Sequence, residues 1–413
     1  MEEQKILRLL EQGKLKMHEI EKHVKDANEA AKIRRTFIEK KFGKKLALVG
    51  SHAIDFSDAI NRNIENPIGA TQVPLGYSGE LKIRGDFANG AYPIFLATTE
   101  GKLVAGISRG IKALNESNGV NAYVVKDGMT RDILIRVEDA NEASQVTKWV
   151  NSKDGFEFLK GAFAVSTKHG SLNEVKPYAI GREIHLRFRA DTGSAMGMNM
   201  LTIAASHATE EMAALFEKRR KIKIRILSES GNMCADKKPA LVDFIEGRGV
   251  SVIADAYLPN RVVQKAFGVK PEAIAEINVS KNLQGSALAG SHGYNAHVAN
   301  VLAAMYIAHG QDVAQIVEGS QAMTSMAVKG SGLYISLYLP AIEVGTYGGG
   351  TKRETQKEIL ELIGLYGEND NEGITRKKFA EVVAGACLAG ELNLLAAESG
   401  LDLARSHSKV KRG

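Results

Sequence analysis

The chain has 413 residues, of which 44% are hydrophobic and 25% are charged, and its formal net charge is +6. This composition predicts two or three globular domains and excludes a disordered or fibrous chain. Cys234 and Cys387 are too few for a disulfide framework or a cysteine zinc site, so we expect a cytoplasmic protein without a bound metal. Charges fill the first thirty residues and no run approaches the ~18 apolar residues of a membrane span, which argues against a signal peptide and a membrane anchor.

The positive charge lies mainly at the two ends. Residues 1–46 contain thirteen Lys or Arg and eight Asp or Glu, and residues 405–413 add further basic side chains. A nucleic-acid-binding protein built on this segment is one alternative. No aromatic residues are interleaved for base stacking, however, so solvated helix faces are the simpler interpretation and no nucleic-acid partner is expected. Apolar residues recur at helical spacing over residues 2–42, which predicts an amphipathic helical lead-in.

Beyond residue 65, glycine, proline and short β-like runs replace the charged helical pattern. The next part of the chain alternates strands and helices, which is typical of a small α/β unit. Its predicted strands are 133–137 and 184–189, and its predicted helices are 140–150 and 198–218. After Pro239 the predicted elements are helix 240–247, strand 249–257, helix 296–309, strands 333–339 and 342–344, and helices within 372–406.

Glu100 is the first candidate for acid–base chemistry. It follows an apolar strand-like run and precedes a glycine in residues 97–101. An exposed turn residue is the simpler interpretation. A carboxyl group in a dry cleft could instead have its pKa raised and donate a proton to a developing alkoxide.

A second candidate is the run Asp-Lys-Lys-Pro at residues 236–239, which follows Ser230 and Asn232. Adjacent lysines on a loop are usually solvated charge. Here an acid, two cations and a rigid proline follow a hydroxyl and an amide, a combination suited to binding a dicarboxylate-like acyl group. The Lys237 ammonium could stabilise the oxyanion formed as a hydride arrives.

Two further candidates lie nearer the C-terminus. Asp312 ends the run Gly-Gln-Asp at 310–312, where a helix-terminal turn is an equally good interpretation. If it lies between Lys237 and Glu100, its charge would keep the lysine cationic and favour a protonated glutamic acid. His407 is most simply an exposed side chain in a basic tail, yet an imidazole on a mobile flap could protonate a departing thiolate.

Two glycine-rich runs could hold a phosphate-bearing cofactor. Residues 193–200 lead into a predicted helix, whose N-terminal amides could accept a pyrophosphate, and residues 345–350 form the second run. Neither run is a GxGxxG between a strand and a helix, so a Rossmann fold is not supported. His292 and His297 are five residues apart and lack a third ligand, which predicts no metal site.

Taken together, these runs resemble the signatures of the hydroxymethylglutaryl-coenzyme A (HMG-CoA) reductases, in particular the soluble, archaeal-type, class I-like form. The matching runs, in the order of the family, are residues 65–69, 97–101, 127–131, 195–200, 236–239, 310–312 and 348–351, with His407 beyond them. The resemblance implies an α+β fold with four parts. These are a helical N-terminal segment (1–64), a large mixed α/β HMG-CoA-binding domain (65–131 and 229–370), an inserted small ferredoxin-like NADP-binding domain (132–228) and a C-terminal helical flap (371–413).

The resemblance also implies a function, a two-step reduction of HMG-CoA by two NADPH to mevalonate and free coenzyme A, in the mevalonate pathway of isoprenoid biosynthesis. Catalysis would use Glu100 as the acid, Lys237 as the oxyanion stabiliser, Asp312 as the residue that tunes both, and His407 as the proton donor to the thiolate. The implied HMG-CoA-binding residues are Arg109, Arg131, Ser230, Asp236, Lys238, Lys281, His297, Asn300 and Ser406. The implied cofactor-binding residues are Thr167, Lys168, Ser194, Met196, Gly197, Met198, Asn199, Asn232, Gly348 and Gly349. A homodimer or higher oligomer is implied too, with active sites at the subunit interface and the lysine-bearing loop reaching across from a neighbour.

Two departures from the family pattern concern the cofactor. The NADPH-preferring form has an acidic residue where this chain has Ser194, although Asp191 lies three residues earlier. Where that form has a Ser-Arg pair, Thr167-Lys168 keeps a hydroxyl and a cation but loses the bidentate guanidinium. We expect NADPH, with NADH as the alternative. A coenzyme A thioester lyase or transferase that uses the same acyl pocket without hydride transfer is the other open enzyme class.

Overall fold

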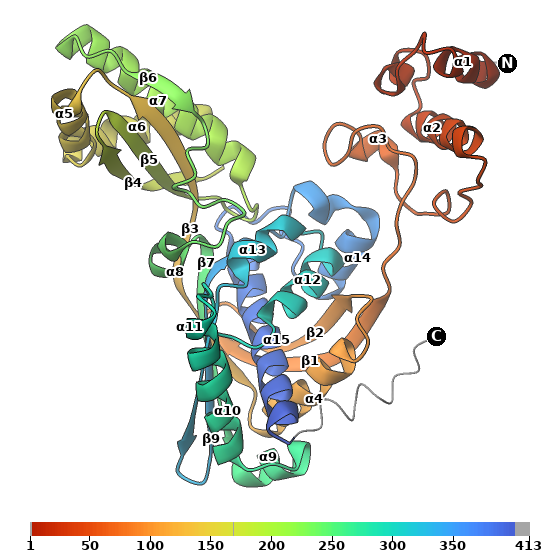
Figure 1. Ribbon diagram of the computed structural model, residues 1–413, viewed down its shortest axis with the longest axis vertical. Helices are drawn as coiled ribbons and strands as arrows, with labels where there is room; N and C mark the ends of the chain where they lie inside the picture. Colours follow the sequence, from red (N-terminus) through yellow and green to blue (C-terminus); the bar gives the residue numbers. More distant parts are fainter. Residues whose placement is uncertain (1, 168, 401–413) are drawn as a thin grey trace.

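The structure is a computed structural model that describes residues 2–167 and 169–400. It is a mixed α+β fold in which helices and strands alternate along most of the chain (Figure 1). The strands form one nine-stranded sheet with the main order β2-β1-β3-β7-β9-β8. The strands of this path are β1 (Leu75–Gly85), β2 (Asn89–Ala97), β3 (Val120–Arg136), β7 (Gly249–Pro259), β8 (Met323–Lys329) and β9 (Gly332–Ile342).

Strand β3 is the element that joins the two parts of the sheet. Its first half, Asn121–Gly128, pairs antiparallel with β7. Its second half, Met129–Arg136, pairs antiparallel with β5 (Glu183–Asp191), and the end of the strand also pairs with β6 (Arg225–Ser228). Strand β4 (Ser171–Ile180) extends the second part through β5. The predicted run 127–131 therefore lies where β3 changes partners.

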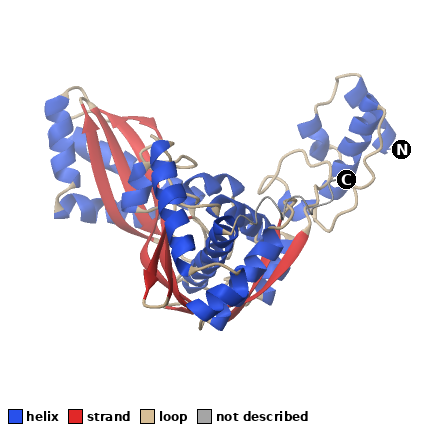
Figure 2. Cartoon of the chain, turned by 60° about the horizontal axis from the view of Figure 1, so that its bottom comes forward, coloured by secondary structure: helices blue, strands red, loops and turns tan. Residues whose placement is uncertain are grey.

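The first hydrophobic core lies between the main path of the sheet and the helices packed on it. Figure 2 shows the strands bending around these helices. The largest helices of this first core are α4 (Leu103–Glu116), α12 (Val298–Ala308) and α15 (Ile374–Ser399). Helix α15 lies within the range 372–406 where the sequence predicts helices. Among the described helices it alone is long and apolar enough to cross a membrane, so the prediction that no run approaches a membrane span is wrong. Since 89% of its apolar window is buried inside the protein, the core accounts for that apolar character.

A second, separate core lies between strands β3 to β6 and three helices. The helices are α5 (Ala140–Val150), α6 (Lys153–Ser166) and α7 (Met198–Arg220). Helix α5 has its predicted bounds, and α7 extends the predicted helix by two residues because Lys221 ends it in a left-handed conformation. Side chains of α5, α6 and α7 share this cluster with Leu186 and Phe188 of β5.

The N-terminal lead-in is helical, as its periodicity predicts. It contains α1 (Glu2–Glu11), the 3-10 helix η1 (Met17–Lys22), α2 (Ala27–Phe42) and α3 (Phe56–Ala59), and it projects from the rest of the molecule (Figure 1). It has a small core of its own. Several of its basic side chains pair with acids of the same segment, including Arg34 with Glu21, and Lys40 with Glu11. These pairs neutralise single charges locally and leave the excess of basic over acidic residues in this segment unchanged.

Two predicted strand boundaries are wrong. The predicted strand 133–137 is only the end of β3, whose earlier half is interrupted in sequence by the charged residues 126–127. The predicted strands 333–339 and 342–344 are one strand, β9, which ends at Ile342. Proline cannot donate a hydrogen bond to a ladder, but an irregularity in the β7–β9 register accommodates Pro340, whose carbonyl accepts the Ser251 hydroxyl at 2.6 Å.

The remaining elements are shorter and connect these layers. They are α8 (Leu241–Glu246), α9 (Asn260–Phe267), α10 (Pro271–Ile277), the π-helix η2 (Asn278–Gly285), α11 (Ser286–Leu288), η3 (Val313–Gln315), α13 (Ile316–Gly319), η4 (Gly349–Lys352) and α14 (Glu354–Leu362). The predicted helices 240–247 and 296–309 correspond to α8 and α12, each slightly shorter than predicted.

The close crossing of α4 and α15 depends on Gly110. A Cβ added at Gly110 would lie 2.1 Å from the carbonyl oxygen of Ala389, and a backbone atom cannot move aside. We expect Gly110→Ala to lower the free energy of unfolding by about 1–3 kcal/mol, as overpacked cores do. Chemical denaturation would measure this change.

The control is Gly161→Ala on α6, where an added Cβ meets nothing within 4 Å. It should raise stability by about 0.5–1 kcal/mol, because alanine is the better helix former. An equal effect of the two substitutions would contradict the tight crossing.

Candidate functional site

The segment between β6 and α8, residues 229–240, is called the lysine loop below. Three of its non-glycine residues have left-handed backbones, Asn232 at φ 71°, Ala235 at φ 53° and Lys237 at φ 57°. Such conformations are unfavourable for residues with a Cβ and persist only where surrounding contacts hold them. The contacts described next therefore determine where the side chains of the loop point.

Lys237 pairs with Asp312, as the sequence analysis hypothesised. The Lys237 Nζ lies 2.9 Å from the Asp312 Oδ2. The other oxygen of Asp312 accepts the Ala314 N–H at 3.1 Å and caps η3, so the carboxylate is held at two points. The hydrogen bond to Asp312 raises the pKa of Lys237. Lys237 is therefore held cationic, the state needed to stabilise an oxyanion.

Glu100 lies apart from this pair. It is exposed at the surface of the chain, and Asn300 Nδ2 donates to its Oε1 at 3.4 Å. Among the described residues, Asp312 makes no hydrogen bond or ion pair with Glu100. Within one chain, Asp312 therefore contacts Lys237 but does not lie between Lys237 and Glu100. Glu100 instead lines a cavity of about 540 Å³, called the Glu100 cavity below, together with the predicted residues Arg109, Lys281, His297 and Asn300.

Predicted substrate-binding residues also gather at the lysine loop. Arg131, at the partner change of β3, donates to the Ser230 hydroxyl at 3.0 Å and lies 3.9 Å from Asp236. Its Nε donates to Thr202 of α7 at 2.8 Å, which fixes the direction of the guanidinium. Lys238 folds back and donates to the Asp236 carbonyl at 3.0 Å. The loop thus carries a hydroxyl, a carboxylate and a cation close together, and Arg131 of β3 adds a second cation beside them.

The buried side chain of Arg248 supports the lysine loop. The sequence analysis missed this residue. The side chain is fully buried, and it contacts Glu318 at 2.7 Å and Asp236 at 3.0 Å. The Glu318 Oε1 also accepts the backbone N–H of Lys237 at 2.9 Å. Arg248 and Glu318 therefore position Asp236 and Lys237 together. The available signal was an arginine between two glycines directly before an apolar strand, at 247–249.

The same guanidinium connects the loop with the start of α7. Arg248 lies 2.9 Å from the sulfur of Met198, the first residue of that helix. Glu343 is a further buried carboxyl group beside Arg248, at 3.4 Å. Burial raises the pKa of Glu343 well above its ordinary value, with the charge of Glu318 adding to the effect. Its protonated form is therefore favoured, which limits the net negative charge around one arginine.

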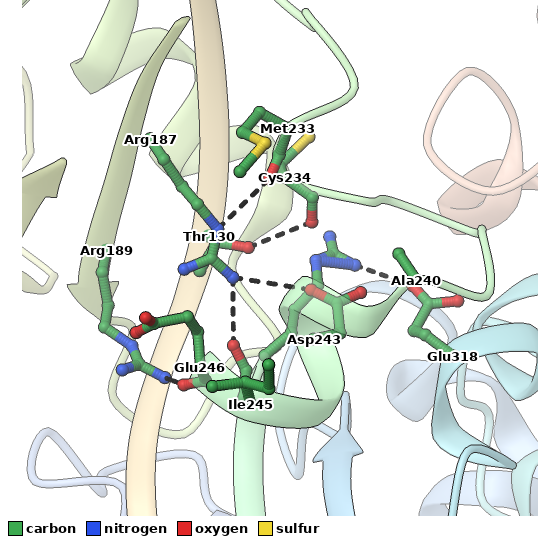
Figure 3. A network of polar contacts seen from close by, with 12 residues as sticks. Thr130, Arg187, Arg189, Met233, Cys234, Ala240, Asp243, Ile245, Glu246 and Glu318 are labelled. Atoms are coloured by element: carbon green, nitrogen blue, oxygen red, sulfur yellow. Dashed lines mark hydrogen bonds and ion pairs between the residues drawn. The ribbon is translucent and has the colours of Figure 1, made fainter. Parts of the chain in front are cut away.

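A second buried arginine, Arg187 of β5, links the middle of the lysine loop to α8 and to the residue that follows this helix (Figure 3). It donates to the carbonyl oxygens of Met233 at 3.2 Å and Gly247 at 3.1 Å. It also reaches Asp243 of α8 at 3.5 Å. On the neighbouring strand, the buried carboxylate of Asp132 accepts the Met233 N–H at 2.8 Å. Strands β3 and β5, which belong to the second core, thus set the position of the lysine loop. The functional residues of this loop face the first core.

The two predicted cofactor runs are adjacent in space. Thr346 N donates to the Ser194 carbonyl at 2.8 Å. A Cβ added at Gly345 would lie 2.6 Å from the Met196 nitrogen, so glycine is required at this approach. Gly197 caps α7 with φ 90°, and an added Cβ there would lie 2.3 Å from Thr192. These contacts bring two glycine runs, far apart in sequence, to one helix N-terminus.

Asp127 and Asp191 have structural partners behind this turn. Arg376 of α15 forms a two-pronged contact with Asp127, at 2.8 Å for each oxygen, and lies 3.3 Å from Asp191. Its Nε also donates to the Gly193 carbonyl at 2.6 Å. Arg376 therefore holds the turn that precedes α7, and Asp191 is engaged with it.

The other predicted cofactor residues are spread over three segments. Asn199 lies in the first turn of α7, Thr167 caps the end of α6, and Asn232 lies in the lysine loop. Gly348 and Gly349 have positive φ at the start of η4, and nothing lies within 4 Å of a Cβ added at either position. Lys168, Ser406 and His407 lie outside the described residues.

Glu391 of α15 is a second group that sequence reasoning missed. It is fully buried and accepts the N–H groups of Ala296 and His297, each at 2.8 Å, and the Thr324 hydroxyl at 2.7 Å. These contacts fix the turn that carries His297 into the Glu100 cavity. The signal was an acidic residue within an otherwise apolar helix.

Known proteins match the chain over almost its full length. A family model described as hydroxymethylglutaryl-coenzyme A reductase matches residues 30–412. The 3-hydroxy-3-methylglutaryl-coenzyme A reductase of Pyrococcus abyssi is 47% identical over 410 residues, which cover 98% of this chain and 99% of the relative. The reductase of that name from Methanothermobacter thermautotrophicus is 43% identical over 405 residues and 98% of each chain.

A solved structure has a similar fold. The class II 3-hydroxy-3-methylglutaryl-CoA reductase from Streptococcus pneumoniae, bound to NADPH in open conformations, superposes with a TM-score of 0.63 over 96% of each chain. The sequence identity is 18%, so this likeness concerns the fold.

Asp243 should make stability depend on pH. Burial raises its pKa to about 7, against the opposing effects of Arg248 and Arg187, whereas its ordinary value is 3.8. Because the folded-state pKa is the higher one, its contribution to stability is complete below pH 3.8 and is lost as the pH rises through about 7. Asp243→Asn lacks this titration, so its melting temperature relative to the wild type should increase across that interval.

Thermal denaturation of both proteins at a series of pH values would measure this difference. Asp154→Asn, at an exposed position on α6, serves as the control. A difference for Asp243→Asn that does not change with pH would contradict the raised pKa.

Proposed function

Because the chain belongs to the hydroxymethylglutaryl-coenzyme A reductase family, we propose that its lysine loop and its Glu100 cavity are two parts of one active site. The reaction is the two-step, four-electron reduction of the HMG-CoA thioester by two NADPH. It passes through mevaldyl-CoA and mevaldehyde and gives mevalonate and free coenzyme A. The protein is therefore an oxidoreductase of the mevalonate pathway.

The pair of Lys237 and Asp312 is the observation that carries this proposal. The 2.9 Å contact keeps a cation at the tip of a loop that Arg248 and Glu318 hold in place. As each reduction proceeds, negative charge develops on the carbonyl oxygen of the substrate. The Lys237 ammonium would donate a hydrogen bond to that oxygen, in a position arranged before the reaction. Glu100 would supply the proton that the resulting alkoxide takes up.

The residues around the start of α7 fit a phosphate-bearing nicotinamide cofactor. The glycine turn precedes the N-terminal amides of a 23-residue helix, and Ser194, Ala195 and Gly197 beside them are small and only partly buried. NADPH, when bound, supplies the hydride for each reduction. We assign it to Ser194, Met196, Gly197, Met198 and Asn199, with Thr167, Lys168, Asn232, Gly348 and Gly349 completing the site. Thr167 and Lys168 would contact the 2′-phosphate through a hydroxyl and a cation.

HMG-CoA would bind between the two parts of the site. Lys281, His297 and Asn300 line the Glu100 cavity, where they would contact the acyl group. Arg131, Ser230, Asp236 and Lys238 would contact it from the lysine loop. Arg109 lies in the same cavity, contacts Asn393 at 2.7 Å and stacks over Phe267, and its guanidinium would contact the phosphates of coenzyme A.

A homodimer would bring the two parts together. Within one chain, Lys237 pairs with Asp312 and Glu100 lines a separate cavity. A second chain placed with its lysine loop over the Glu100 cavity would complete both active sites. The separate cores support the division into a large substrate domain (65–131 and 229–370) and an inserted cofactor domain (132–228), preceded by the helical segment 1–64. The proposed C-terminal flap, 371–413, conflicts with the burial of α15 in the first core. The flap that would bring Ser406 and His407 to the substrate is therefore limited to the residues that follow this helix.

Lys237→Ala should abolish the oxidation of NADPH that depends on HMG-CoA. Loss of one oxyanion donor lowers kcat by about 100- to 1,000-fold, and the fold should survive because the Lys237 side chain is 44% exposed. The measurement is NADPH absorbance with HMG-CoA, together with a thermal melt. The exposed Lys223→Ala is the matched control. Near-normal turnover of Lys237→Ala would overturn the mechanism.

His407→Ala should separate the two reductions. Only the thioester step releases a thiolate that needs a proton. Reduction of HMG-CoA should therefore fall about 100-fold or more, the effect of losing a general acid, while reduction of free mevaldehyde should remain near the wild-type rate. Parallel assays with the two substrates would test this role, and an equal loss on both would exclude it.

A further inference from the structure

Lys281 lies in an unusual stretch of helix that points its side chain into the Glu100 cavity. The residue belongs to the π-helical segment η2, Asn278–Gly285, which follows directly on α10. Wide helical turns of this kind occur frequently at functional sites, because the extra residue redirects side chains. Both Lys281 and Glu398 line the cavity.

The ammonium group of Lys281 is already paired with the carboxylate of Glu398. The Nζ lies 2.6 Å from each of the two Glu398 oxygens, so both oxygens share one cation. Glu398 comes from the last turn of α15, 117 positions along the chain. Its side chain is 17% exposed and that of Lys281 is 36% exposed, so the pair lies at the wall of the cavity, accessible to solvent.

The chemistry of this contact matches that of the expected substrate. The acyl group of HMG-CoA ends in a free carboxylate, and the proposed function assigns Lys281 to that group. The position that this carboxylate would take on Lys281 is therefore occupied by a carboxylate of the protein itself. Two carboxylates cannot share one ammonium at this distance without repelling each other.

We propose that Glu398 is a built-in competitor of the substrate carboxylate, and that HMG-CoA displaces it from Lys281 on binding. This inference rests on the proposed function. Ion pairs that remain partly in contact with solvent contribute little to stability, so the exchange of one carboxylate for another is feasible. The consequence is a weaker apparent affinity for the acyl group, because each binding event must first break the internal pair.

The competition also affects selectivity. With Glu398 in place, the charge of Lys281 is neutralised, and a small anion without further contacts gains little by entering. HMG-CoA would make additional contacts in the cavity, whose lining includes Arg109 and Asn300. Glu398 would thus favour a ligand that binds the whole cavity over one that offers a carboxylate alone.

Glu398→Gln tests the competition because it keeps the shape of the side chain and removes its charge. The KM for HMG-CoA should fall at least threefold. The inhibition constant of free coenzyme A, which lacks the acyl carboxylate, should stay within twofold of the wild type. Glu272→Gln, at an exposed position on α10, is the control for loss of one surface charge and should leave both constants unchanged.

Three outcomes would overturn the proposal. A higher KM would mean that Glu398 orients Lys281 for the substrate. An unchanged KM would mean that the pair does not compete, and an equal decrease for HMG-CoA and coenzyme A would mean a general change of charge. In a Lys281→Met background the Glu398→Gln effect should disappear, and persistence of the effect would equally exclude competition. Glu398→Ala provides a second way to remove the charge if the glutamine variant does not fold.

Binding of free 3-hydroxy-3-methylglutarate, measured by calorimetry, separates this inference from the proposed function. The acid should bind Glu398→Gln at least threefold more tightly than the wild type, whether or not the protein oxidises NADPH. Absence of NADPH oxidation with tighter binding would reject the function and keep the competition. Normal oxidation with unchanged binding would reject the competition alone.

Discussion

The buried guanidinium of Arg248 is stable only because three carboxyl groups converge on it, Glu318 at 2.7 Å, Asp236 at 3.0 Å and Glu343 at 3.4 Å. A charge this deep is unfavourable unless it is paired and hydrogen-bonded, and removing one partner of such a set is strongly destabilising. The set extends to function because Glu318 also accepts the backbone N–H of Lys237. The left-handed conformation of Lys237, and hence the direction of its ammonium, depends on this network of buried charges. Without that role, the network would only add the cost of burying charges in the core.

Strand β3 gives this network its scaffold. Because β3 pairs with β7 in its first half and with β5 in its second, one rigid element belongs to both cores. Arg131, at the change of partners, can therefore contact Thr202 of α7 and Ser230 of the lysine loop. The residues proposed to bind the substrate and the cofactor are thus held in one frame, and the proposed hydride transfer requires the reacting atoms in near contact.

The two lysines assigned to the substrate differ in how their partners are held. Asp312 also caps η3, so the partner of Lys237 is held at two points, and its hydrogen bond raises the pKa of the lysine. Glu398 comes from the final turn of α15, and its carboxylate pairs with Lys281 at the wall of the cavity. A fixed carboxylate suits a catalytic cation, whereas an exchangeable one suits a cation that must bind and release a carboxylate.

The sequence by itself determined the helices with clear periodicity, such as α5 and α7, and the residue types of the site. The sequence identifies Lys237, Asp312, Glu100 and the glycine runs, because the residue types and their immediate neighbours along the chain indicate the chemistry. It did not determine that 333–344 contains a single strand, since the irregularity that accommodates Pro340 depends on β7. Nor did it reveal Arg248, Glu391 or the pairing of Lys281 with Glu398, 117 positions apart. Periodicity reports which face of an element is buried, but which distant charge meets which is decided only when the cores pack and exclude water.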